Sequence, residues 1–209
     1  MWTANACSGF LGVFNVQGAS WDRDLRQFRT HDPSPPQLTA PCRPADVETA
    51  AHLAAAAPGE PSGRFATLTR GAGAVHVGAL WDALQVAVAP ASADLLTIVP
   101  LASLGGVDFA PFGFAAMLNT GGSVTAWAVE RGGGGRNGGG GALTHRVDVR
   151  GEGVFAAYAS CRPSAVQVDG AIVDAAAVTW DSASSRLGVD VPATGESVQH
   201  VLRLSFPSA

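Results

Sequence analysis

Short apolar runs rich in β-branched and aromatic residues follow one another along most of the chain, and Gly, Pro and Asp separate them. Runs of this length, with turn residues between them, are typical of antiparallel strands. They predict about eleven or twelve strands packed as a two-sheet antiparallel β-sandwich, so the expected fold class is all-β. Beyond residue 63 the predicted strands lie at residues 64–70, 74–80, 85–88, 95–99, 107–118 with a bend between 110 and 114, 123–129, 144–149, 154–159, 166–173, 178–180, 186–191 and 201–206.

Three connections in this region have a definite chemistry. Pro111 and Gly113 interrupt an apolar run and predict a bend or bulge there. Asp169-Gly170 suits a two-residue type I′ hairpin turn, because both central positions of that turn need a positive φ. The glycine-rich run at residues 132–141 lacks the Lys-Ser/Thr ending of a phosphate-binding loop, so it is interpreted as a flexible hairpin excursion.

The first part of the chain has a different pattern. Residues 38–40 predict a short edge strand, and residues 45–57 are the one helical stretch, with Asp46 as its expected cap. The charged segment at residues 22–29 is interpreted as an exposed loop. We therefore divide the chain into a junction at residues 1–63, with a strand, a loop and a short helix, and a β-sandwich at residues 64–209.

One stretch, residues 9–21, joins an apolar strand to a polar end. Period-two alternation makes its first half a core strand, whereas the amides of Asn15 and Gln17 replace apolar side chains near its end. Gly18 allows the backbone to turn, so that Trp21 can lie beside these amides. Sugar sites favour this mixture of a planar aromatic ring and polar groups, so Asn15, Gln17 and Trp21 are the candidate binding residues. The alternative is a buried strand whose amides bond to the protein itself.

Composition excludes several function classes. The chain has 209 residues, of which 47% are hydrophobic and 14% charged, as in globular proteins. A net charge of -4 argues against a nucleic-acid partner. The sequence contains neither a signal-peptide pattern nor an apolar stretch of membrane-spanning length, so a cytoplasmic protein without a membrane partner is expected. Three cysteines without ligand spacing predict neither disulfides nor a zinc site.

The sequence offers little catalytic chemistry. Asp22 and Asp24 are the only close acidic pair near the candidate sugar corner, and carboxylates beside arginines in a loop are usually solvated. The five histidines are scattered, so no catalytic residue, metal site or cofactor is predicted. Tryptophans can stack on sugar rings, although core packing explains most of them; Trp81 and Trp180 adjoin turn-like residues and are candidates for exposure.

Several segments nevertheless resemble a known family. Residues 2–21 are similar to the segment that follows the catalytic barrel in plant raffinose synthases, stachyose synthases and the related alkaline α-galactosidases, or seed imbibition proteins, of glycoside hydrolase family 36. The similarity continues through residues 95–100, 109–122, 149–153 and 168–170 and covers almost the whole chain in order. The family usually has Cys where Val16 stands and Gly where Ser20 stands.

This resemblance implies what the chain does and what it lacks. Family members carry their catalytic aspartates on a (β/α)₈ barrel that would precede Met1, and a barrel needs about 250 residues. The resemblance therefore implies a C-terminal β-sandwich that supports a missing barrel and is not catalytic by itself. The parent reaction would move a galactosyl group from galactinol to sucrose through a covalent intermediate, without a cofactor. A sugar would then be a partner only in the full enzyme, and the uncovered apolar face is expected to self-associate.

Three alternatives stay open at this point. The first alternative is the C-terminal part of an alkaline α-galactosidase, although the sequence of residues 117–122 is more similar to the raffinose and stachyose synthases. A second possibility is a free-standing carbohydrate-binding module that uses Asn15, Gln17 and Trp21 without catalysis. The third is a non-functional truncation whose exposed barrel-facing surface makes it aggregate. Met1 leads almost at once into a strand, as in a segment internal to a longer protein.

Overall fold

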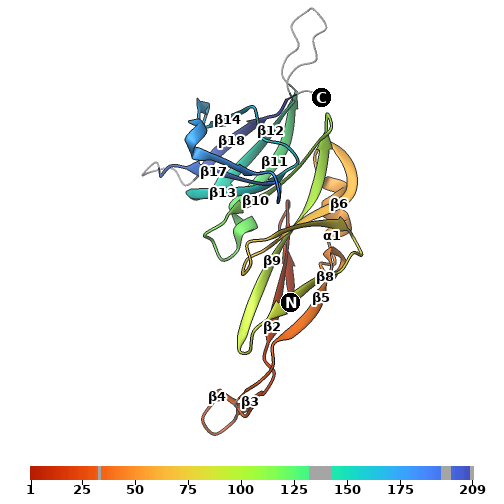
Figure 1. Cartoon of the computed structure of the whole chain (residues 1–209), viewed down its shortest axis with the longest axis vertical. Helices are drawn as coiled ribbons and strands as arrows, with labels where there is room; N and C mark the ends of the chain where they lie inside the picture. The colour runs from red at the N-terminus through yellow and green to blue at the C-terminus, as the bar shows by residue number, and fades with distance from the viewer. Residues whose placement is uncertain (33, 132–142, 194–198, 208–209) are drawn as a thin grey trace, which may run out of the picture.

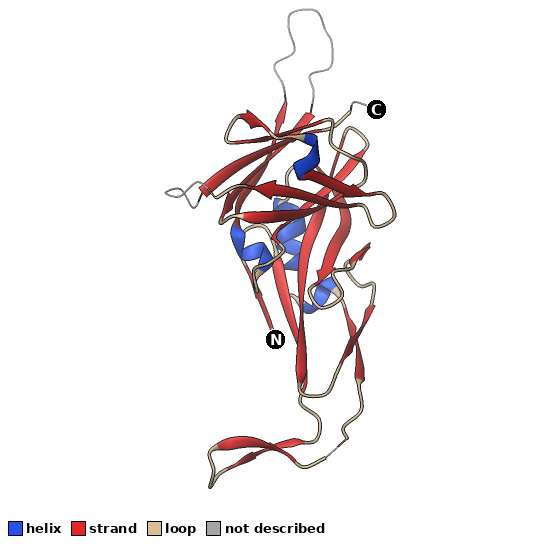
Figure 2. Ribbon diagram, turned by 60° about the vertical axis from the view of Figure 1, so that its left-hand side comes forward, coloured by secondary structure: helices blue, strands red, loops and turns tan. Residues whose placement is uncertain are grey.

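The computed structural model describes residues 1–32, 34–131, 143–193 and 199–207. Its described residues form antiparallel sheets and one short α-helix, which confirms the all-β class (Figures 1 and 2). The larger sheet has nine strands: β1 Trp2–Ala4, β2 Gly9–Asn15, β6 Glu60–Thr69, β7 Val75–Ala79, β9 Ser92–Leu104, β10 Val107–Phe114, β13 Gly153–Ala159, β16 Val178–Asp181 and β17 Arg186–Val191.

The other strands form one sheet of five and two pairs. The five-stranded sheet contains β11 Val124–Arg131, β12 Leu143–Arg150, β14 Ala165–Val168, β15 Ala171–Ile172 and β18 Gln199–Ser205. The pairs are β3 Ala19–Asp22 with β4 Gln27–Thr30, and β5 Leu38–Cys42 with β8 Leu84–Val88. The helical elements are α1 Ala50–Ala56 and the 3₁₀ turns η1 Pro44–Asp46, η2 Thr120–Ser123 and η3 Ala175–Ala177.

The main core lies between the two larger sheets. Strands β10, β13 and β17 contribute fully buried side chains such as Phe109, Phe155 and Leu187, and the five-stranded sheet contributes Leu202 and Leu204. In β18 every second residue is buried while its neighbours are more exposed, which is the alternation expected of a sheet with one covered face. This core makes the upper half of the molecule a two-layer sandwich (Figure 1).

A second core covers the lower half of the nine-stranded sheet. Leu96 and Ile98 of β9 project from the same face as Phe65 of β6. The β5-β8 pair and the segment around α1 cover that face, with Val86 and Val47 among the buried contacts. The long strand β9 therefore belongs to both halves of the molecule, because its far end pairs with β10.

Two turns confirm the predictions from local sequence. Asp169 has a φ of 52° and Gly170 a φ of 84°, as a type I′ turn requires, and they join β14 to β15. The pairing of β10 with β13 shifts register between Pro111 and Gly113, which is the predicted bulge. Gly113 has a φ of 103°, and a Cβ there would lie 2.1 Å from the carbonyl oxygen of Thr120.

Other expectations need correction. The described residues contain eighteen strands, more than predicted, because several have only two to four residues. Residues 22–29 are not a loop: they form most of the β3-β4 hairpin. The α-helix begins at Ala50, and Asp46 instead accepts a hydrogen bond from the Arg43 backbone N–H at 2.8 Å in the preceding 3₁₀ turn. Residues 115–118 form a turn, not part of a strand.

Two expectations stay predictions, because the described residues do not test them. The glycine-rich run at residues 132–141 lies outside the described residues. The proposed division at residue 63 falls within β6, and β2 of the junction pairs along its whole length with β9 of the sandwich region. The division therefore describes a change in sequence pattern along the chain, and it stays a prediction as a domain boundary.

The stability of the protein should fall between pH 6.5 and pH 4 because of His145. This side chain is 1% exposed, stacks on Phe109 and accepts a hydrogen bond from the Trp127 indole at 3.3 Å. Burial lowers the pKa of His145 from 6.5 to about 4. Over this range the unfolded chain therefore binds a proton that the folded protein does not, and the free energy of unfolding should decrease by up to about 3 kcal/mol.

Urea unfolding at a series of pH values measures this decrease. The variant His145→Phe keeps a ring in the core and removes the titrating group, so it should lose this part of the pH dependence. His52→Gln removes a histidine exposed on α1 and should keep it. An equal decline in His145→Phe and in the wild type would contradict the assignment.

Candidate functional site

The candidate residues lie where the chain leaves the body of the protein. Residues 14–32, which we call the arm, run from the end of β2 through the β3-β4 hairpin and project below the sheets (Figures 1 and 2). Gly18 has a φ of 75°, and its carbonyl oxygen accepts a hydrogen bond from the His31 backbone N–H at 2.6 Å. A Cβ at Gly18 would lie 2.7 Å from that of Asp32, so glycine permits the close approach that starts the hairpin.

Asn15 fastens the base of the arm to the body. It is 1% exposed, and its amide nitrogen donates hydrogen bonds to the carbonyl oxygens of Pro36 at 3.1 Å and Val88 at 3.0 Å. Its side-chain oxygen accepts a hydrogen bond from the Gln17 backbone N–H at 3.2 Å. Both amide protons of Asn15 thus bond to the protein itself. For this residue the structure therefore agrees with the alternative of a buried strand with internally bonded amides.

Gln17 and Trp21 are exposed, in contrast to Asn15. The Trp21 indole makes an edge contact with Phe28 across the hairpin, with ring centroids 5.3 Å apart. Trp21 therefore does not fold back beside the amides; it lies further out, in β3, where Ser20 and His31 also form a side-chain hydrogen bond. The structure thus separates the buried amide of Asn15 from the two exposed residues.

Asp22 has a structural role in the hairpin turn. One carboxylate oxygen accepts hydrogen bonds from the backbone N–H groups of Asp24 and Leu25, both at 3.0 Å. The other oxygen lies 3.4 Å from the guanidinium of Arg29. The Leu25 hydrogen bond, followed by the contact with Arg29, lowers the pKa of Asp22. Asp22 is thus a charged turn residue, and this geometry supports no proton transfer by it.

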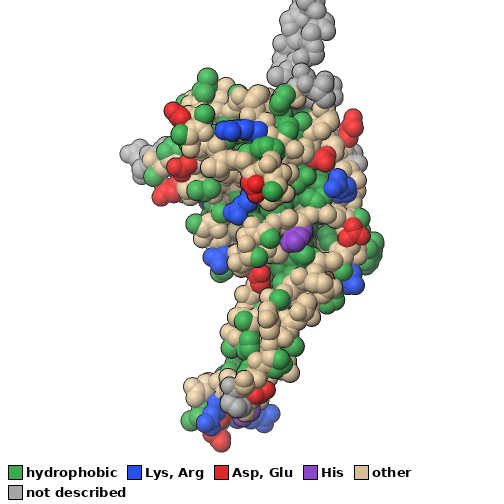
Figure 3. Space-filling view, in the orientation of Figure 1, with side chains coloured by type: hydrophobic (Ala, Val, Ile, Leu, Met, Phe, Trp, Pro, Cys, Tyr) green, Lys and Arg blue, Asp and Glu red, His purple; other side chains and the backbone are tan. Residues whose placement is uncertain are grey.

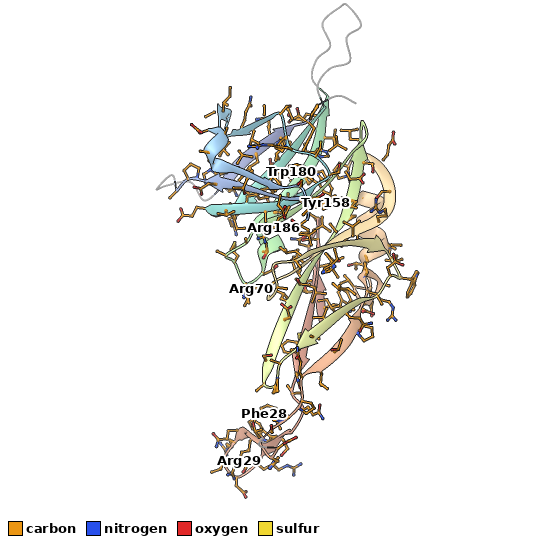
Figure 4. The ribbon with its side chains drawn as sticks, in the orientation of Figure 1. Phe28, Arg29, Arg70, Tyr158, Trp180 and Arg186 are labelled. Atoms are coloured by element: carbon orange, nitrogen blue, oxygen red, sulfur yellow. The ribbon has the colours of Figure 1, made fainter. Side chains whose placement is uncertain are left out.

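The arm also exposes apolar side chains that the sequence interpretation did not single out. Five of its residues have exposed fractions between 52% and 70%, and we call them the arm surface: Phe14, Val16, Trp21, Leu25 and Phe28. Figure 3 shows hydrophobic side chains along the arm, and Figure 4 shows Phe28 and Arg29 at its far end, away from the sheets. Exposed apolar groups gathered in this way mark interaction surfaces. The available signal was the continuation of period-two alternation through Phe14 and Val16.

The described residues show neither a metal centre nor a membrane span. No three His, Cys, Asp or Glu side chains among them are grouped as metal ligands. None of the helices in the described part of the chain has the length and apolar character needed to cross a bilayer. The three cysteines form no disulfide, and Cys42 is buried beside β8.

The fold and the arm together define an all-β sandwich that presents an exposed apolar hairpin. Comparison with known protein families then identifies the family: residues 1–191 match the one described as "Raffinose synthase or seed imbibition protein Sip1". The chain belongs to this family, which confirms the resemblance carried by residues 2–21 and 109–122.

Individual relatives agree with this assignment. The chain is 32% identical over 201 residues to a galactinol-sucrose galactosyltransferase of Oryza sativa subsp. japonica, a match covering 94% of this chain and 23% of that protein. It is 28% identical over 175 residues to a stachyose synthase of Pisum sativum, covering 83% and 19%. A probable galactinol-sucrose galactosyltransferase of Arabidopsis thaliana is 28% identical over 176 residues, covering 83% and 21%. The chain thus spans less than a quarter of the length of these relatives.

Replacing Asn15 by Ala should destabilise the protein by about 2–3 kcal/mol. The change removes three hydrogen bonds and leaves the buried carbonyl group of Val88 without this donor. Gln17→Ala, two residues further along and exposed, should change the free energy of unfolding by less than about 0.5 kcal/mol. Urea unfolding of the two variants makes the comparison, and equal effects would show that the buried amide does not fasten the arm.

Proposed function

We propose that this chain is the C-terminal β-sandwich portion of a galactinol-sucrose galactosyltransferase. In this proposal its role is structural: it packs against a catalytic (β/α)₈ barrel, and it does not catalyse transfer by itself. The relatives that it matches carry galactosyltransferase or synthase names, which favours a parent enzyme that transfers a galactosyl group over one that hydrolyses it. The donor would be galactinol and the acceptor sucrose.

The arm surface is the observation that carries the structural role. A monomeric protein rarely holds this many large apolar side chains together on a thin projection, because each adds to the apolar area in contact with water. Burial of one such side chain in an interface contributes about 1.5–3 kcal/mol. Trp21 and Phe28, already paired edge to face, would enter that interface as a preformed unit.

The position of the arm fits a contact with a separate folding unit. Its base is fixed to the body by Asn15, whereas the hairpin beyond Gly18 packs on neither of the two larger cores. A projecting hairpin with a fixed base can reach across a boundary between two domains while the sandwich keeps its own core. Gln17, exposed beside Gly18, would be a polar residue at the rim of that contact. A carbohydrate-binding role for Asn15 has less support, because its amide protons are already engaged.

A chimeric enzyme tests this proposal. The C-terminal portion of the Oryza sativa galactosyltransferase that matches this chain is replaced by the chain, and galactosyl transfer from galactinol to sucrose is measured. The chimera should be active and the isolated chain should not. The double variant Trp21→Ala/Phe28→Ala in the chimera should lower the melting temperature, because the interface loses its two aromatic groups. For the same reason it should lower the transfer rate by at least about tenfold.

Ile172→Ala is the matched control. Ile172 is an exposed apolar residue on β15, in the other half of the molecule, and its replacement should leave the rate and the melting temperature within the error of the measurement. Turnover by the isolated chain at the rate of the chimera would refute the non-catalytic role. Equal behaviour of the arm variant and the control would refute the role of the arm surface.

A further inference from the structure

A cleft of about 160 Å³ lies between the nine-stranded sheet and the β5-β8 pair, and none of its lining residues belongs to the arm surface. Thr67 of β6, His76 of β7 and Leu84 of β8 contribute to its lining. Leu96 and Ile98 lie on its apolar side, where they belong to the second core. The space corresponds to about five water molecules, which is enough for one small ring compound. Figure 1 shows β5 and β8 beside the lower half of β9, where the cleft is found.

Thr67 places a hydroxyl group on the wall of this cleft. Its side chain is 7% exposed and lies on the face that also carries Ile98 and His76, its partners in the two neighbouring strands. The Thr67 hydroxyl has no hydrogen-bond partner among the described residues, whereas the hydroxyl of Thr69 donates to the carbonyl oxygen of Ala74 at 3.3 Å. The Thr67 oxygen is not sealed from solvent: it opens on the cleft, so it can form a hydrogen bond with a molecule bound there.

The other polar groups of the cleft offer both donors and acceptors. Arg43 contributes a guanidinium that forms no ion pair with a described residue. Asp82 uses one carboxylate oxygen to accept a hydrogen bond from the Ala79 backbone N–H at 2.8 Å, and its other oxygen is not engaged in this turn. The charges of Arg43 and Asp82 balance each other. Such a lining suits a neutral ligand whose groups both donate and accept hydrogen bonds, as hydroxyls do.

Two neighbouring features extend the cleft. A second, shallower hollow of about 320 Å³ shares His76 and Leu84 with it and continues along Gln85 to Asp94. Trp81, in the turn between β7 and β8 and next to Asp82, is 73% exposed. An exposed indole beside a small polar cleft adds an aromatic surface that can stack on the apolar face of a sugar ring.

We propose that this cleft binds one ring of a neutral sugar, with Thr67, His76 and Asp82 as its hydrogen-bonding residues. Leu96 and Ile98 would contact the apolar face of the ring, and a second ring of an oligosaccharide would follow the hollow along Gln85. The site is a binding site and not a catalytic one. This proposal is independent of the structural role proposed above, because the residues of the cleft lie outside the arm. The cleft is also formed without any contribution from a catalytic barrel.

Saturation-transfer NMR and calorimetry on the complete chain test the proposal, with galactose, sucrose and inorganic phosphate as probes. Galactose and sucrose should bind saturably and phosphate should not. Thr67→Val preserves shape and removes the hydroxyl, so it should weaken sugar binding about three- to tenfold. His76→Ala should weaken binding in the same direction. Thr97→Val is the matched control: Thr97 is equally buried, faces the opposite side of the same sheet, and its replacement should leave affinity within twofold.

Each other outcome overturns the proposal. Absence of saturable signal from both sugars, in a chain with a cooperative thermal transition, would show that the cleft holds water only. Binding of phosphate in place of sugar would refute the neutral ligand. Unchanged affinity in His76→Ala, an exposed side chain whose removal leaves the core intact, would place any sugar elsewhere, even if Thr67→Val failed to fold. The chimera experiment measures the effect of arm variants on transfer rate and melting temperature, so its outcome does not depend on sugar binding in the cleft.

Discussion

The pairing of β9 with three other strands is the constraint on which the structure depends. One edge of β9 pairs with β2 and, beyond the end of β2, with β10. The opposite edge pairs with β6. Residues on alternate faces of β9 enter different cores, since Leu96 and Ile98 belong to the second core while Val99 and Leu101 belong to a third cluster on the opposite face. The chain can therefore place an N-terminal strand and a later sandwich in one continuous sheet.

This arrangement also explains why the arm and the cleft are close in the fold but separate in character. Val88 of β8 accepts the hydrogen bond from Asn15 that fastens the arm, and Leu84 at the other end of β8 lines the cleft. The β5-β8 pair has enough apolar contact with β9 to remain in place, yet it packs incompletely near Thr67. The arm surface is apolar and projects outward, whereas the cleft lies between strands and is lined by both polar and apolar side chains. The two features suit different partners, a protein surface for the arm and a small polar molecule for the cleft.

Local chemistry was the part of the structure that sequence predicted best. The Asp169-Gly170 turn and the bulge at Pro111 and Gly113 depend on φ preferences of a few adjacent residues, so the sequence alone predicted both. The β3-β4 hairpin was missed because its charged residues resemble a solvated loop. Its turn depends on Asp22, whose carboxylate bonds to two backbone N–H groups, and on Arg26 at a φ of 52°. A charged sequence does not reveal such a contact in advance.

The sequence by itself determined the all-β class, most of the strand positions and the family, because these follow from residue periodicity and from long matching segments. Only the tertiary structure showed which polar side chain at the end of β2 is buried and which is exposed. Asn15 and Gln17 look equivalent in sequence, yet Asn15 is buried against the carbonyl groups of Pro36 and Val88, and Gln17 is exposed. The same holds for Thr67, an ordinary strand threonine that lines a cleft only because the β5-β8 pair packs over that face of the sheet. Hydrogen-bond partners far along the chain make that difference, and no local pattern encodes them.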